Sequence, residues 1–175
     1  MIRLLLSVII LFSMIPTNAF AAETKLTDEQ IYAKRQELYN RMQSVTQIPW
    51  YYFAAVDQYE RNVRRVRRDI PKAKGVIGIY YKPEVWAGPL NPNSQDSNPM
   101  SIQFFGGMGM DGNGDGVADS ANDEDVLFTF ANYLKSYGTD KENIKIALWE
   151  YYQRDKTVGL IMNHMKLYST YNTLK

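Results

Sequence analysis

The stretch DEDVLFTFANYLKSYG, residues 123–138, predicts an amphipathic helix over Asp123–Tyr137. Its apolar side chains recur at intervals of three and four residues, so they lie on one side of a helix. Gly138 follows directly and is a natural C-cap. A helix with one apolar side must pack against other elements, and the apolar side consists of Val126, Leu127, Phe130, Tyr133 and Leu134.

Helical segments are predicted throughout the rest of the chain. Thr27 and Gln30 form the pattern of a capping box and open a helix over residues 28–44. Three more helices are expected over residues 50–68, 141–153 and 157–171, while residues 82–99 are expected to form an irregular loop. Residues 75–81, GVIGIYY, are β-prone and predict an extended segment or a small hairpin strand. The expected fold class is therefore mainly α, with one short β-prone patch.

The first 21 residues have the pattern of a secretory signal peptide. Arg3 precedes an apolar run over residues 4–15, and Ala19, Phe20 and Ala21 supply a processing site. Cleavage after Ala21 predicts a secreted or cell-wall-associated protein, and an uncleaved anchor is the alternative. Residues 22–175 have the length of a single domain, expected to be a monomer, and the chain has no cysteine with which to form a disulfide.

Charge is unevenly distributed, although the net charge is only +1. A basic run contains Arg61, Arg64, Arg65, Arg67, Arg68, Lys72 and Lys74, opposed only by Glu60 and Asp69. Two interpretations stay open, a solvated helix face and a surface for an anionic wall polymer. The near-neutral total and the predicted export disfavour nucleic acid as a partner.

An acidic, glycine-rich loop follows, DGNGDG at residues 111–116, and it predicts a structural calcium site similar to an EF-hand loop. Oxygen ligands at alternate positions converge on one point, and a glycine at the sixth position permits the bend. Asn122 stands where the usual glutamate would be, so Asp125 would close a longer loop. The predicted ligands are Asp111, Asn113, Asp115, the Val117 carbonyl and Asp125, and a solvated acidic turn is the alternative.

Three segments resemble lytic transglycosylases of the membrane-bound B type. They are IPWYYFAAVDQYE at residues 48–60, MGMDGNGDGVADSANDEDVLFTFANYLKSYG at 108–138 and ALWEYY at 147–152. The resemblance implies a single lysozyme-like transglycosylase domain with Glu60 as its one catalytic acid. The implied lyase reaction cleaves the MurNAc–GlcNAc bond of peptidoglycan glycan strands and forms a 1,6-anhydromuramoyl product. Such an acid needs a partly buried setting that keeps it protonated near neutral pH.

The same resemblance implies substrate contacts by Gln103, Tyr151 and Tyr152. Trp86, in the loop PEVWAGPLNPN, is either a sugar-stacking platform or a core aromatic. The chain departs from the family pattern at Arg61, around Gln103 and at Tyr152. These departures support a competing hypothesis, a catalytically weak or inactive lysozyme-like module that binds wall glycan or a wall-assembly partner. In a simpler alternative, Glu60 and Asp57 form exposed ion pairs with Arg64 and Arg61, four residues further on.

Overall fold

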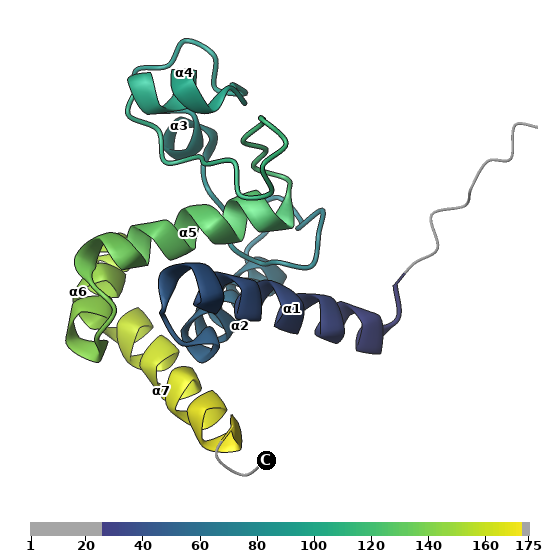
Figure 1. Cartoon of the computed structure of the whole chain (residues 1–175), viewed down its shortest axis with the longest axis vertical. Coiled ribbons are helices and arrows are strands. Elements are labelled where there is room, and N and C mark those ends of the chain that lie inside the picture. Colours follow the sequence, from purple (N-terminus) through teal and green to yellow (C-terminus); the bar gives the residue numbers. More distant parts are fainter. Residues whose placement is uncertain (1–25, 173–175) are drawn as a thin grey trace, which may run out of the picture.

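Helices make up most of the chain in the computed structural model, which describes residues 26–172, with side chains to residue 170 (Figure 1). The predicted signal peptide therefore lies outside the described residues. None of the helices in the described range is both long and apolar enough to cross a membrane. The helices are α1 (Asp28–Thr46), α2 (Trp50–Val66), α3 (Pro83–Trp86), α4 (Pro99–Phe104), α5 (Asp123–Tyr137), α6 (Lys141–Tyr152) and α7 (Asp155–Asn172).

Local signals set the ends of the long helices. The Thr27 side chain accepts from the Gln30 amide and the Gln30 side chain accepts from the Thr27 amide, so the capping box is confirmed. Helix α5 has the predicted bounds, and Asn122 caps its start by accepting from the amides of Glu124 and Asp125. The prediction of an uninterrupted loop over residues 82–99 is wrong, because α3 begins there with a proline in its first turn, where no amide donor is needed.

The five long helices surround the core, and each of them packs against two of the others. Helix α2 packs on α1 and α7, α5 packs on α1 and α6, and α6 packs on α7. Phe53 of α2 and Phe130 of α5 are fully buried in this core. Helices α3 and α4 lie above α5 in Figure 1, and Trp86 of α3 and Ile102 of α4 are buried as part of the same core. The mainly α fold class is thus confirmed.

Residues 75–81 belong to no helix or strand in the described part of the chain, and they bend at Gly75 and Val76. Side chains replace a partner strand. The amides of Val76 and Ile77 donate to Asp123, and the Gly78 amide donates to Asp57. The carbonyls of Val76 and Ile79 accept from Arg35 and Arg64. The predicted hairpin strand is therefore wrong, because carboxylates and guanidinium groups of α1, α2 and α5 satisfy this backbone instead.

Candidate functional site

Glu60 lies on the inner side of α2 and is only 9% exposed. Its Oε1 atom accepts a hydrogen bond of 2.6 Å from the Tyr152 hydroxyl, at the end of α6. Burial raises the pKa of Glu60 above its ordinary value, against smaller lowering effects from Tyr152, Arg64 and Arg67. A carboxyl group with these properties can hold and release a proton closer to neutral pH than an exposed one.

Arg64 lies one helical turn after Glu60 but forms no ion pair with it among the described residues. Its Nη2 atom donates to the Ile79 carbonyl at 3.2 Å, and its guanidinium lies 5.1 Å from the centre of the Tyr80 ring. The interpretation of Glu60 as an exposed, ion-paired residue is therefore wrong. Arg64 is instead held against residues 79 and 80, with Glu60 as a nearby buried charge.

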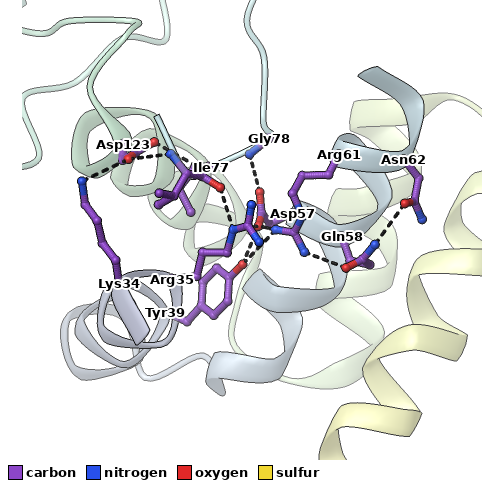
Figure 2. A network of polar contacts seen from close by, with 11 residues as sticks. Lys34, Arg35, Tyr39, Asp57, Gln58, Arg61, Asn62, Ile77, Gly78 and Asp123 are labelled. Atoms are coloured by element: carbon purple, nitrogen blue, oxygen red, sulfur yellow. Dashed lines mark hydrogen bonds and ion pairs between the residues drawn. The ribbon is translucent and has the colours of Figure 1, made fainter. Parts of the chain in front are cut away.

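Asp57 is fully buried and lies at the centre of a polar network between α1, α2 and residues 76–78 (Figure 2). It accepts from the Tyr39 hydroxyl and the Gly78 amide and pairs with Arg61. The predicted Asp57–Arg61 pair thus forms, but inside the protein and not on its surface. The close approach requires glycine at position 78, because a Cβ there would lie 2.5 Å from Cγ of Arg61 and 2.8 Å from its backbone nitrogen. The network holds residues 76–78 against helices α1 and α2.

Residues of the 75–81 segment line a cavity of about 570 Å³. The aromatic side chains of Tyr80, Tyr81 and Trp86 line it, and so do the cationic side chains of Arg64, Lys72 and Lys74. The cavity is also lined by residues 94–97 and 118–123 and by Val126 of α5. A cavity of this size, with aromatic walls and several polar groups, has the properties of a small-ligand site.

The structure brings some of the predicted substrate contacts near Glu60 and leaves others apart. Tyr152 touches Glu60 directly, and Tyr151 packs against Phe130. Trp86 is 3% exposed and donates from Nε1 to the Ala118 carbonyl, so it is both a core aromatic and part of the cavity wall. Gln103 is exposed on α4 and does not line the cavity.

Sequence reasoning missed Arg64 and Tyr81 as cavity residues and Asp57 as the centre of the buried network. Asp57 did carry a signal. It follows Phe53 by four residues, and this spacing puts its carboxylate on the apolar side of the predicted helix. Such a group must be paired when buried. Arg64 and Tyr81 carried no comparable signal.

The acidic loop turns its carboxylates toward its own backbone. Asp125 is fully buried, and it accepts from the amides of Gly112, Asn113 and Asp119 at 2.8, 3.2 and 2.8 Å. Asp111 accepts from Gly114 and Gly116. Within residues 26–172, no group of three or more histidine, cysteine, aspartate or glutamate side chains is placed to hold a metal ion. Calcium binding by the predicted set, which includes Asn113 and the Val117 carbonyl, stays a prediction.

Comparison with known proteins gives one informative likeness. The chain is 53% identical over 163 residues to the L-Ala–D-Glu endopeptidase of Bacillus subtilis (strain 168). The alignment covers 93% of this chain and 49% of the relative, so the chain spans about half the length of that relative. No family model matches the chain. No solved structure matches it either.

This likeness corrects the activity expected from the sequence. The relative is named for cleavage of a peptide bond, whereas a lytic transglycosylase cleaves a glycosidic bond. The identification as a membrane-bound-B-type lytic transglycosylase, the lyase reaction and the anhydromuramoyl product are therefore wrong, and the alternative of an inactive glycan-binding module has no support. The motifs behind the resemblance encode a glycine-rich turn, a helix and a buried carboxyl group. Such features describe a scaffold and do not define the bond that reacts.

Proposed function

We propose that this chain acts on the peptide part of peptidoglycan and takes part in hydrolysis of the bond between L-Ala and D-Glu. The observation that carries the proposal is the 53% identity, across 93% of the chain, to a protein named for that activity. An identity this high over nearly the whole chain argues for a shared substrate as well as a shared fold. Because the relative is about twice as long, the share of the activity that belongs to this chain must be measured.

The cavity has the chemistry that an acidic peptide needs. D-Glu brings carboxylate groups, and the cavity presents the guanidinium of Arg64 and the ammonium groups of Lys72 and Lys74. Aromatic walls suit the apolar backbone and methyl group of an L-Ala residue. Asp96, Asp119 and Asp123 also line the cavity, so it offers partners to the backbone amides of a peptide as well as to its carboxylates.

Glu60 is the candidate acid–base residue. In peptide hydrolysis, water adds to the L-Ala carbonyl carbon, the carbon–nitrogen bond breaks, and the D-Glu nitrogen leaves as an amine after gaining a proton. A carboxyl group with a raised pKa can accept the proton of the attacking water and then donate one to the leaving nitrogen. Its hydrogen bond from Tyr152 supports this role. Glu60 itself does not line the cavity, but Arg64, one helical turn further along α2, does.

A second candidate function is that the chain holds the stem peptide while other groups break the bond. The described residues show neither a cluster able to hold a metal nor a cysteine nucleophile, and the one histidine, His164, is on α7 and does not line the cavity. These are the groups that most often accelerate peptide hydrolysis. In this second candidate function the cavity binds the stem peptide, and the carboxyl group of Glu60 has only a structural role.

Finer parts of the proposal concern the fold and the rest of the wall. We infer a lysozyme-like arrangement of the helices from the motifs at residues 48–60 and 108–138. Contact with glycan strands follows because stem peptides are attached to them. Arg65, Arg68, Lys72 and Lys74 are exposed and form no ion pair among the described residues, which supports a contact with an anionic wall polymer.

Incubation of the chain with purified peptidoglycan, followed by mass spectrometry, tests the proposal. We expect new peptides that begin with D-Glu and new glycan-linked L-Ala carboxyl ends. Glu60→Gln should abolish both if Glu60 is the acid–base residue. Binding of soluble stem peptide without cleavage would favour the second candidate. The absence of both binding and cleavage would contradict the proposal.

A further inference from the structure

The acidic loop contains three glycines, and each of them follows an aspartate or an asparagine. The pairs are Asp111–Gly112, Asn113–Gly114 and Asp115–Gly116. Asn113 is the only asparagine of the chain that is followed by a glycine. Such an asparagine is chemically labile, because glycine has no side chain to keep its backbone nitrogen away from the asparagine amide carbon. The sequence therefore places its most reactive asparagine in this loop.

The reaction at such a pair takes place within the chain and needs only water. The Gly114 amide nitrogen loses its proton and forms a bond to Cγ of Asn113. The bond between Cγ and Nδ2 then breaks, and the nitrogen that leaves takes up a proton and departs as ammonia. Water opens the resulting cyclic imide on either side, which gives aspartate or isoaspartate. Both products carry a new negative charge, and isoaspartate also lengthens the backbone.

The structure places the amides of all three glycines on carboxylates. Gly112 donates to Oδ1 of Asp125 at 2.8 Å. Gly114 and Gly116 donate to the two oxygens of Asp111, at 2.7 and 2.8 Å. An amide that donates to a carboxylate keeps its proton more firmly, because the negative charge opposes formation of an amide anion. Asp111 therefore occupies the nitrogen that would attack Asn113.

The Asn113 side chain is held as well. Its Nδ2 atom donates to Oδ2 of Asp115 at 2.9 Å, and its Oδ1 atom accepts from the Asp115 amide at 2.9 Å. Both bonds restrict rotation of the side chain, on which the approach of Cγ to the Gly114 nitrogen depends. Asn113 is only partly buried and Gly114 is exposed, so water has access to this pair. Hydrogen bonding, and not burial, is what protects it.

We propose that Asn113 is a latent deamidation site and that Asp111 protects it by holding the Gly114 amide. Protection belongs to the folded loop, so loosening of the loop starts the conversion to aspartate or isoaspartate. The new carboxylate would lie beside Asp111 and Asp115, and repulsion among like charges would keep the loop from returning to its present arrangement. The reactivity of Asn113 is independent of which bond of peptidoglycan the chain acts on.

Mass spectrometry during incubation at mildly alkaline pH tests this inference. Conversion of the side-chain amide to a carboxyl group raises the mass of the peptide that contains Asn113, and chromatography separates aspartate from isoaspartate. Because a hydrogen bond to a charged group is equivalent to about tenfold or more in rate, we expect Asp111→Ala to deamidate at Asn113 faster than the wild type by about that factor.

Two substitutions in the same loop are the controls. Asp119→Ala removes a carboxylate that accepts from the Ala121 amide and not from a glycine amide, so it should leave the rate unchanged. Asp115→Ala releases the Asn113 side chain but leaves the Gly114 amide on its acceptor. It should therefore accelerate the reaction less than removal of that acceptor does.

The wild type supplies two further references. In urea the loop loses its hydrogen bonds, so the wild type should deamidate at Asn113 faster than in its folded state. Asn93 is exposed and is followed by serine, so the same samples contain a second asparagine outside the acidic loop. Its rate should be the same in the folded wild type and in every folded variant.

Equal rates at Asn113 in the wild type and in Asp111→Ala would overturn the protective role of Asp111. Equal acceleration by Asp111→Ala and Asp115→Ala would also overturn it, because general loosening of the loop would then explain the effect. A folded wild type that reacts as fast as in urea would show that the loop gives no protection at all. If Asp111→Ala does not fold, Asp111→Ser takes its place and should also react faster than the wild type; an unchanged rate would count against the proposal.

Discussion

Replacing Asp57 by alanine should strongly destabilise the protein, because three polar partners would lose their acceptor in the interior. The Asp57 side chain is fully buried, and it serves the Tyr39 hydroxyl, the Gly78 amide and the Arg61 guanidinium. Removing one member of a buried ion pair costs about 3–5 kcal/mol. We therefore expect the free energy of unfolding to fall by about 4 kcal/mol. With about 2–4 °C per kcal/mol for a domain near this size, the melting temperature should fall by about 8–16 °C.

Urea denaturation followed by tryptophan fluorescence measures this change, with a second substitution as the control. Asp69→Ala makes the same chemical change in an exposed ion pair with Arg67, and it should leave the midpoint unaltered. Adding Arg61→Leu to Asp57→Ala should recover part of the loss, because it removes the cation left without a partner. A midpoint for Asp57→Ala equal to that of Asp69→Ala would refute the reasoning, since the network would then contribute nothing to the fold.

Three other changes are predicted. The pKa of Glu60 is raised above 4.5 in the folded protein, so ionisation of Glu60 opposes folding. The wild type should therefore lose stability relative to Glu60→Gln as pH rises from 4.5 through the folded pKa. Urea midpoints of both proteins across this range check it, and a constant difference would contradict it. Asp125→Ala leaves three backbone amides without an acceptor, so it should lower the free energy of unfolding by about 3 kcal/mol in the same urea assay. A loss of less than about 1 kcal/mol would contradict the role of Asp125 as the acceptor for these amides. Calcium should raise the melting temperature relative to excess chelator, and Asp115→Ala should abolish the difference; identical melting curves would rule the site out.

The long helices could be predicted from sequence because their signals are local. The apolar spacing and terminal Gly138 fixed both ends of α5, and the Thr27–Gln30 capping box fixed the start of α1. Helices α3 and α4 span four and six residues, too few for a periodic pattern to appear. Their proline starts were visible in the sequence, but prolines also occur throughout loops.

Long-range pairing could not be predicted in the same way. The β-prone residues 75–81 form no strand, and the groups that accept from their amides are carboxylates 21 and 46–47 residues away in sequence. Nothing in the sequence marks Asp57 and Asp123 as partners of that backbone.

The reacting bond was the hardest feature to predict. A buried glutamate at position 60 was expected from the helix motif, and the structure gives it an apolar setting and a hydrogen bond from Tyr152. A carboxyl group in that setting can exchange a proton with a glycosidic oxygen or with a peptide nitrogen. The environment of Glu60 therefore indicates acid–base capacity without naming the bond.

The most direct test of peptide cleavage is the source of the oxygen in the product. Purified peptidoglycan is incubated with the chain in water enriched in oxygen-18, and the released fragments are analysed by mass spectrometry. Hydrolysis of the L-Ala–D-Glu bond predicts one heavy oxygen in each new L-Ala carboxyl group and an unlabelled D-Glu amine end. Fragments without a new L-Ala carboxyl group, or label confined to sugar products, would contradict the proposal.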